Sequence, residues 1–269
     1  MRRLFTSAGS GLTRSERAWA VRSGRCVRVQ QGIYAEGPEP ASPLDRARGA
    51  VLASRREARG ALAGVLHGLD AVQLDDRPTR RTALAPERVV HVHGTRCGDG
   101  LQTMIDLASI LDDDVWEQAL ESALRKRLLT IADLEAAPPW TPGAPRIRRV
   151  LGGRPPGAPP TESLLETLAL QLARPILGEP LRQLVVRSVH GTFIARIDLS
   201  WPDREIFFEL DGQGHKDQPV YDATRETAVV AATGWLPGRF TWSEITRIPV
   251  STQRRFAELR AQSDRRCAV

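Results

Sequence analysis

The sequence predicts a multi-domain α+β protein, and three observations lead to that fold class. Hydrophobic residues make up 41% of the chain and charged residues 26%, a balance typical of folded globular proteins rather than disordered ones. Apolar residues recur at helical spacing through the middle of the 269 residues, whereas alternating, strand-like patterns occur near both ends. A proline-rich segment, residues 138–160, separates the last part of the chain from the rest.

The charge of the chain is positive and is carried almost entirely by arginine. Lysine plus arginine number 38 against 32 acidic residues, a net charge of +6, and Lys126 and Lys216 are the two lysines. Arginine suits the recognition of phosphate, although a GC-rich genome produces the same excess. The composition is therefore compatible with a nucleic-acid partner without identifying one.

Cysteine usage and hydropathy predict a cytoplasmic protein with no membrane association. Cys26, Cys97 and Cys267 are odd in number, widely separated and without a CxxC pair. This pattern excludes a disulfide scaffold and a structural zinc finger, and it favours a reducing compartment. No apolar run approaches the ~18 residues that a membrane span requires, and the first residues lack the apolar core of a signal peptide.

Residues 1–37 predict a short helix followed directly by a hairpin. Thr13 and Glu16 have the spacing of a capping box, which marks the start of the helix. The alternating residues that follow, 26–29 and 33–35, are expected to pair across a turn. This order is that of the second half of a winged-helix DNA-binding domain. Because about a dozen residues precede the helix, we expect either an abbreviated domain or a start further upstream. The alternative is a small basic cap on the next domain.

Residues 38–137 predict a mainly helical middle domain. Residues 44–69 are rich in alanine, leucine and arginine, and apolar residues follow helical spacing over 115–129. Residues 138–160 hold eight of the 19 prolines and four glycines. Such a density breaks helices and central strands, so this segment predicts a linker with at most one helical turn, around residues 146–151.

Two polar clusters of the middle domain have a structural and a metal-binding interpretation. The aspartates at 112–114 precede a predicted helix, where the helix dipole favours acidic residues, and a metal site is the alternative. His91 and His93 are expected on one face of an exposed strand. Because no third ligand accompanies them, a strand edge is favoured over a zinc site.

The last predicted domain, residues 161–269, opens with a helix followed by two strands. Ser163 and Glu166 have the spacing of a capping box. The helix stripe expected to be buried consists of Leu164, Leu165, Leu168 and Leu172. On the first strand, alternation places on one face Phe193, Ala195, Ile197 and Leu199. On the second strand, the buried residues are expected to be Ile206, Phe208 and Leu210.

Asp198, Glu209 and Asp211 are predicted to meet on the opposite face of this hairpin. With the turn centred on residues 202–203, Asp198 lies opposite Phe207 and points the same way as the two acidic residues of the second strand. Three carboxylates on one face are costly unless a cation or a proton compensates them. Oxygen ligands suit Mg²⁺ or Mn²⁺, and such ions catalyse phosphodiester cleavage by activating water.

This order of residues resembles the very-short-patch-repair-like endonuclease domains of unknown function within the PD-(D/E)xK nuclease superfamily. The resemblance covers roughly residues 160–265, and it rests on Glu166, Asp198, Glu209-Leu210-Asp211-Gly212, His215, Gly234-Trp235 and Arg239-Phe240-Thr241-Trp242. It implies a restriction-endonuclease-like α/β domain at residues 161–269. The first two blocks resemble the N-terminal part of AbiE-type antitoxin regulators, in residues 12–25, 31–35 and 104–108. That likeness implies a winged-helix-like segment and an antitoxin-like helical domain.

The nuclease resemblance implies a role for each acidic residue. Asp198 and Glu209 match the metal-binding pair of the superfamily, and Glu166 matches a helix glutamate that completes the metal shell. Asp211 stands where many superfamily members have a catalytic lysine, whereas the very-short-patch-repair-like domains usually have an acidic residue there. The resemblance implies that His215 compensates as a general acid/base or as a phosphate contact.

Contacts with nucleic acid are expected from five basic residues, Arg14, Arg25, Arg28, Lys216 and Arg225. The resemblance also implies that Asp222 holds the start of a helix. Each site assignment has a simpler alternative: Glu166 and Asp222 as helix caps, Asp211 with Gly212 as a turn, and His215 as a surface residue. Asp198 and Glu209 are the hardest to explain otherwise, because a carboxylate at the end of an apolar strand needs a partner.

The leading hypothesis is a metal-dependent nuclease that hydrolyses phosphodiester bonds of DNA, in repair or defence, with Mg²⁺ or Mn²⁺ as cofactor. The rival is a non-catalytic DNA-binding regulator of AbiE antitoxin type that retains a vestigial nuclease domain. RNA as the substrate stays open, as do a homodimer and a partner encoded by a neighbouring gene. The sequence contains no GxSxG, Walker A or HExxH motif, which disfavours the hydrolase classes that use them.

Overall fold

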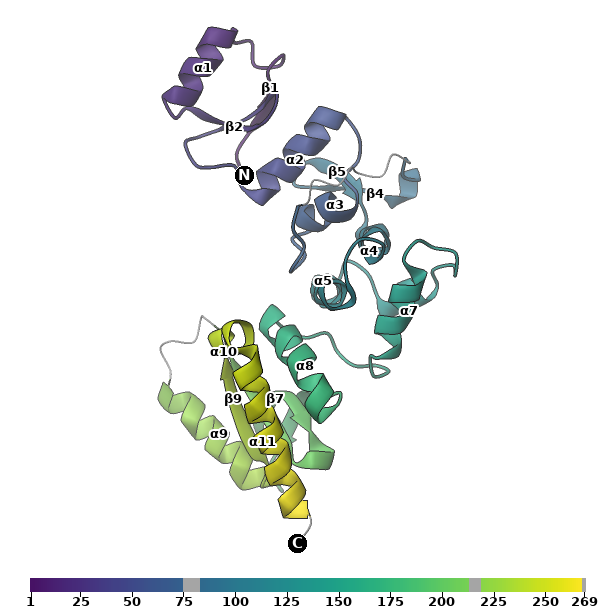
Figure 1. The fold of residues 1–269 in the computed structure, drawn as a ribbon, viewed down its shortest axis with the longest axis vertical. Coiled ribbons are helices and arrows are strands. Elements are labelled where there is room, and N and C mark those ends of the chain that lie inside the picture. The colour runs from purple at the N-terminus through teal and green to yellow at the C-terminus, as the bar shows by residue number, and fades with distance from the viewer. Residues whose placement is uncertain (75–82, 213–218, 268–269) are drawn as a thin grey trace. The chain divides into compact units, whose positions relative to one another are not determined.

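The computed structural model describes residues 1–74, 83–212 and 219–267 (Figure 1). The chain divides into two compact units, Met1–Val150 and Leu151–Val269, and the boundary falls within the predicted proline-rich segment. Both units mix helices and strands, so the protein is of the α+β class expected from the sequence. Within the described residues, no helix combines the length and the apolar character that crossing a membrane requires.

The first unit contains a three-stranded sheet, a two-stranded sheet and seven α-helices in its described residues. Its elements are, in order, β1 (Leu4–Thr6), α1 (Arg14–Arg22), β2 (Cys26–Gln30), β3 (Ile33–Glu36), α2 (Pro43–Ser54), α3 (Gly60–Leu66), η1 (Pro86–Arg88), β4 (Val89–Val92), β5 (Thr95–Gly98), α4 (Gly100–Ala108), α5 (Asp113–Arg125), α6 (Ile131–Glu135) and α7 (Ala144–Gly152).

The helix and hairpin predicted at the N-terminus are confirmed. Thr13 and Glu16 form the capping box, with each side chain accepting a hydrogen bond from the backbone N–H of the other residue. Strands β2 and β3 pair as expected, and Gly32 supplies the positive φ of 76° in the turn. Strand β1 was not predicted; it pairs with β3, giving the antiparallel order β1-β3-β2.

The middle of the first unit departs from the prediction in two places. Residues 44–69, expected to be helical, form two helices, α2 and α3, and α2 ends where Arg55 adopts a left-handed conformation with φ 56°. His91 and His93 do not share a strand, since β4 ends at Val92 and His93 lies in the turn. Instead of one helical turn in a linker, residues 144–152 form the nine-residue helix α7.

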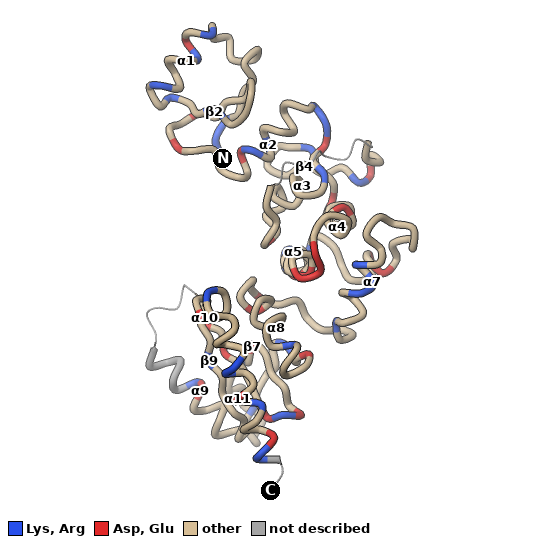
Figure 2. The backbone as a smooth tube through the Cα atoms, viewed as in Figure 1, with Lys and Arg blue, Asp and Glu red and all other residues tan. Residues whose placement is uncertain are grey.

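The aspartates at 112–114 start α5, as the helix-start interpretation expected (Figure 2). The Asp112 carboxylate accepts the N–H of Val115 at 2.8 Å. Asp113 accepts hydrogen bonds from Arg146 and Arg149, which lie on α7, and these contacts lower the pKa of its carboxyl. These ion pairs help to hold the segment predicted as a linker against the helical domain.

The second unit is a four-stranded sheet with helices on both faces. Its elements are, in order, α8 (Leu164–Leu177), β6 (Leu181–Arg187), β7 (Phe193–Trp201), η2 (Pro202–Arg204), β8 (Ile206–Asp211), α9 (Pro219–Thr233), β9 (Leu236–Thr241), α10 (Trp242–Arg247) and α11 (Pro249–Cys267). The strand order is β6-β7-β8-β9, antiparallel except for β8 and β9, which run parallel and are connected through α9.

Each face of this sheet has its own core. Phe208, Phe240 and Phe256 pack against one another on the face covered by α8, α10 and α11. The Phe208 and Phe256 rings are stacked, and Phe240 meets both of them edge to face. On the other face, Phe207 packs with Val229 of α9. The buried residues of α8 are mostly not those predicted. Leu165 is buried as expected, whereas Leu164, Leu168 and Leu172 are partly buried. The remaining buried apolar residues are Ala169, Leu170, Ala173 and Leu177.

The hairpin register differs from the predicted one by two residues. Leu199 pairs with Phe208 and Trp201 with Ile206, so the four connecting residues are 202–205, whereas the sequence predicted 201–204. The connection lies one residue later because η2 forms over 202–204 and Glu205 then takes a left-handed conformation with φ 52°. A shift of two residues preserves the face of every side chain, so Asp198 still comes level with Glu209.

The predicted face of β7 is wrong at one point. Ala195 and Ile197 pack in the core with Phe207, whereas Leu199 packs in the core with Phe208 on the other side of the sheet. The change of face occurs at Asp198. Its neighbours Ile197 and Leu199 pair with residues of β6, but Asp198 itself is not paired with β6 in the register. The alternation of side chains between the two faces of β7 therefore fails at Asp198, one of the predicted metal-binding residues.

Candidate functional site

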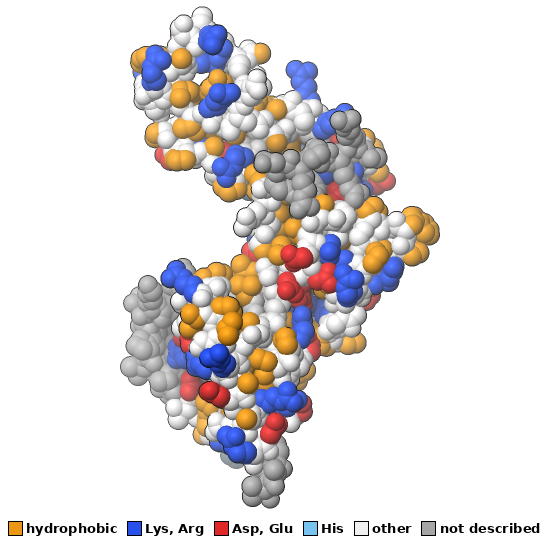
Figure 3. All heavy atoms as spheres, in the orientation of Figure 1, with side chains coloured by type: hydrophobic (Ala, Val, Ile, Leu, Met, Phe, Trp, Pro, Cys, Tyr) orange, Lys and Arg blue, Asp and Glu red, His pale blue; other side chains and the backbone are white. Residues whose placement is uncertain are grey.

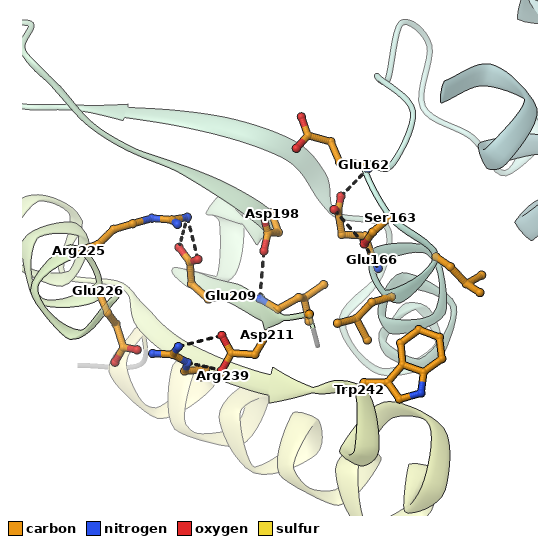
Figure 4. Close-up of a pocket in the computed structure, with 14 residues that line it drawn as sticks. Glu162, Ser163, Glu166, Asp198, Glu209, Asp211, Arg225, Glu226, Arg239 and Trp242 are labelled. Atoms are coloured by element: carbon orange, nitrogen blue, oxygen red, sulfur yellow. Dashed lines mark hydrogen bonds and ion pairs between the residues drawn. The ribbon is translucent and has the colours of Figure 1, made fainter. Parts of the chain in front are cut away.

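The predicted acidic residues of the second unit line one pocket of about 600 Å³ (Figure 4). The pocket lies where the start of α8, the interior of β7, the end of β8, and α9 come together. Its lining residues are Glu162, Ser163, Leu164, Leu165, Glu166, Asp198, Glu209, Leu210, Asp211, Gly212, Arg225, Glu226, Arg239 and Trp242.

Glu166 combines a helix-start role with a place in the pocket. Ser163 is the N-cap of α8, and its hydroxyl accepts the N–H of Glu166 at 3.1 Å. The Glu166 carboxylate accepts hydrogen bonds from Ser163 Oγ at 3.2 Å, from the Glu162 N–H at 2.9 Å and from Gln183 Nε2 at 2.9 Å. Glu166 therefore makes the helix-start contacts of its simpler interpretation, and it also lines the pocket. Burial, together with the charge of Asp198, raises the pKa of Glu166 to about 7.

Asp198 is held by backbone at the point where the β7–β8 ladder ends. Its Oδ2 accepts the N–H of Leu210 at 3.0 Å, so the side chain takes the place of a further ladder partner. This contact fixes the carboxylate across the neighbouring strand. Burial raises the pKa of Asp198, and the Leu210 N–H and the Arg225 charge act in the opposite direction.

Glu209 is paired with an arginine of α9, the helix that packs on the same face of the sheet as Phe207. Arg225 Nη2 donates to both carboxylate oxygens, at 3.0 and 2.8 Å, and also to the Arg196 carbonyl at 2.7 Å. Burial nevertheless raises the pKa of Glu209 to about 7, because the charge of Asp198 adds to the cost of ionisation and partly offsets the contribution of Arg225. The guanidinium of Arg225 is thus the positive charge that is ion-paired with Glu209 in this structure.

Asp211 is separated from the other carboxylates by its own partner. It forms a two-point ion pair with Arg239 of the adjacent parallel strand, with nitrogen–oxygen distances of 2.6 and 2.8 Å. In the β8–β9 register Arg239 is the partner of Glu209, and Asp211 is the partner of Thr241. The Arg239 side chain therefore reaches Asp211 from a position two residues earlier on β9. The pairing turns Asp211 toward β9, away from Asp198 (Figure 4).

The donor set of the pocket fits a hard divalent cation in its chemistry. Glu166, Asp198 and Glu209 offer carboxylate oxygens, and burial makes their simultaneous ionisation costly without a compensating charge. In the conformation described, no three Asp, Glu, His or Cys side chains of the described residues are arranged to hold a metal ion. Arg225 occupies both oxygens of Glu209, so this carboxylate would have to leave Arg225 before it could bind a cation.

The predicted basic residues are distributed over both units of the chain. Arg14, Arg25 and Arg28 lie in the first unit, and all three are exposed. His215 and Lys216 lie outside the described residues, as does the side chain of Asp222. Arg225 is the single member of the predicted basic set that the described residues place at the acidic pocket.

The first unit has a separate pocket of about 430 Å³ beside α1, which sequence reasoning did not anticipate. Its wall includes Trp19, which is 49% exposed, and the Arg25 guanidinium lies 4.5 Å from the centre of that ring. Basic side chains are spread over this part of the first unit (Figure 3). Trp19 could have been noticed in the sequence as the aromatic residue of the arginine-rich helix.

Three residues at or behind the acidic pocket were missed by sequence reasoning. Glu162 lines it and pairs with Arg196 at 2.7 Å. Gln183 donates a hydrogen bond to Glu166 but does not line the pocket, and Arg239 of β9 lines the pocket wall. Glu162 lies one helical turn before a residue already predicted, which is a usable local signal. Gln183 and Arg239 come from strands whose pairing no local pattern specifies.

Comparison with known proteins finds no match: no protein-family model matches the chain, and no curated protein and no solved structure is significantly similar to it. The function is therefore argued from the residues and geometry of the chain itself.

Proposed function

We propose that the protein is a metal-dependent nuclease that hydrolyses phosphodiester bonds of DNA. The observation that supports this most is the grouping of Glu166, Asp198 and Glu209 around one pocket, where burial raises the pKa of each carboxyl. Three ionised carboxylates at one buried site repel one another and destabilise the folded protein unless a cation compensates their charge. Oxygen donors of this kind select Mg²⁺ or Mn²⁺.

In this proposal the three carboxylates hold the cation, and neighbouring groups hold the phosphate. A bound divalent ion would supply Lewis acidity and an activated water. Asp198 is kept in place by the Leu210 N–H, so it offers its second oxygen to the pocket. Arg225, once released from Glu209, is free to contact a phosphate oxygen, and Arg239 presents a second guanidinium at the pocket wall.

The exposed arginines of the first unit support nucleic acid as the substrate class. Arg14, Arg22, Arg25 and Arg28 all have exposed side chains on or beside α1 and β2, and Trp19 adds a partly exposed aromatic ring. Arginines bind the phosphate backbone, and an aromatic ring next to them suits stacking on a base or sugar. DNA is the favoured substrate because the helix-and-hairpin order matches that of DNA-binding winged helices.

A second function is supported by the pairing of the acidic residues. Both Glu209 and Asp211 are neutralised by arginines of this chain, Arg225 and Arg239, and no lysine accompanies them in the described part of the pocket. A DNA-binding regulator that keeps the nuclease-like unit as a structural module would have such internal ion pairs in place of a metal. In that case the carboxylates are dispensable for DNA binding.

Cleavage of supercoiled plasmid and of single-stranded DNA by purified protein tests the proposal. We expect nicking in Mg²⁺ or Mn²⁺, none in EDTA, and loss of nicking in Asp198→Asn. The matched control is Glu179→Gln in the same unit, which removes an ion-paired carboxylate outside the pocket and is expected to keep activity. Salt-sensitive DNA binding without cleavage in any of these metals would instead support the regulator.

A further inference from the structure

Gln183, in the middle of β6, has a backbone conformation that a non-glycine strand residue rarely adopts. Its φ is 55°, in the left-handed region. The β6–β7 pairs continue on either side of it, Arg182 with Leu199 and Leu184 with Ile197, but Gln183 and Asp198 are missing from the register. The irregularity is thus shared by the two residues that face each other across the strands.

The irregularity explains how Asp198 reaches the pocket. On one side of Asp198, Ile197 packs with Phe207 in one core, and on the other side Leu199 packs with Phe208 in the other core. Strand β7 therefore changes the faces of its side chains at Asp198. Asp198, released from pairing with β6, turns its carboxylate to the N–H of Leu210 on β8. A regular ladder at position 183 would hold Asp198 in strict alternation with its neighbours.

The side chain of Gln183 is equally unusual. Its Nε2 donates to Glu166 Oε2 at 2.9 Å. Its Oε1 is buried and has no hydrogen-bond donor within the described residues. The amide cannot be turned to satisfy this oxygen, because Oε1 would then face the Glu166 carboxylate. A buried acceptor without a partner costs stability, as does the left-handed backbone.

We propose that Gln183 is a positioning residue of the acidic site, whose side chain orients Glu166 and whose left-handed backbone frees Asp198. This inference rests on the proposed metal-dependent function and deepens it. A residue chosen for stability alone would be glycine for the backbone or an apolar residue for the interior. Glutamine has a property that neither of these offers, because its amide donates a hydrogen bond to the Glu166 carboxylate. The amide is neutral, so it neither competes with the cation as a positive charge would nor repels Glu166 as a negative charge would.

The experiment measures Mn²⁺ binding by the electron paramagnetic resonance signal of the free ion, using full-length wild type, Gln183→Met and Gln183→Gly. Methionine keeps the length of the side chain and removes the amide. Glycine removes the amide and accepts the left-handed backbone without strain, so it keeps the fold if methionine does not. Gln102→Met is the matched control, because the Gln102 amide also donates to a carboxylate, that of Asp106, at 3.0 Å in the first unit.

Both Gln183 variants are expected to bind Mn²⁺ about 10- to 100-fold more weakly than wild type, the usual effect of removing a group that orients a ligand. Urea unfolding in EDTA is expected to leave Gln183→Gly at least as stable as wild type, which a purely structural role does not allow. Gln102→Met is expected to bind Mn²⁺ as wild type does.

Wild-type affinity in both Gln183 variants would overturn the inference while leaving the proposed function standing. An equal loss of affinity in Gln102→Met would also overturn it, since the effect would then be general. Absence of Mn²⁺ binding by wild type would refute the proposed metal-dependent function, and the role of Gln183 with it.

Discussion

Raising the pH from 5 to 8 in the absence of divalent metal is expected to destabilise the second unit. Burial raises the pKa of Glu166 and of Glu209 from 4.5 to about 7. Between these values the folded unit binds more protons than the unfolded chain, so the free energy of unfolding falls as the pH rises. Below the lower value both states are protonated, and above the upper value both are ionised, so the change is confined to this window.

The size of the effect follows from the two pKa values. A pKa of about 7 in place of 4.5 corresponds to about 3 kcal/mol of lost stability for one fully ionised glutamate. Both values include the charge of the same Asp198, so the two contributions overlap, and a total loss of about 3–4 kcal/mol is expected. Carboxylates with lowered pKa values, such as Asp45 at about 2, change stability in the opposite direction, but only at lower pH.

The assay is urea unfolding at pH 5 and pH 8, followed by pulsed hydrogen exchange in peptides from β7 and β8, so that the second unit is observed separately. Glu166→Gln is expected to lose a large part of the pH dependence, because its amide does not ionise. Mg²⁺ is expected to restore stability at pH 8, since the metal binds the ionised site. Stability that is independent of pH, or that rises from pH 5 to pH 8, would refute the electrostatic description of the pocket.

Three further predictions address single residues. Arg225→Gln removes the internal cation of Glu209 and is expected to tighten Mn²⁺ binding several-fold in calorimetry; weaker binding would show that Arg225 supports the site. Asp211→Asn breaks a half-exposed ion pair with Arg239, so a stability loss of about 1 kcal/mol with unchanged Mn²⁺ affinity is expected, and lost affinity would make Asp211 a ligand. Arg28→Ala is expected to lower the slope of log binding constant against log salt by about 1 for duplex DNA, whereas an unchanged slope would place DNA elsewhere.

Local sequence signals predicted the elements of the site but not their connections. The capping residues Thr13 and Ser163 mark helices that begin where expected, because a cap is a contact between neighbours in the chain. Alternation placed Asp198 and Glu209 on strands of one hairpin. The register was wrong by two residues because the 3-10 turn at 202–204 and the left-handed Glu205 have no distinctive sequence pattern.

The parts that could not be predicted depend on contacts between distant segments. Arg225 and Arg239 reach Glu209 and Asp211 from α9 and β9, and their partners are set by the packing of the sheet. Gln183 breaks the alternation of two strands at once, against the propensity of its own segment.

The central claim, that Glu166, Asp198 and Glu209 hold one divalent cation, is tested most directly by diffraction from crystals grown with Mn²⁺. We predict an anomalous peak about 2.1–2.2 Å from oxygens of Asp198 and Glu209, with Arg225 displaced from Glu209. A map with no peak in the pocket, and with Arg225 still bonded to both Glu209 oxygens, would contradict the account.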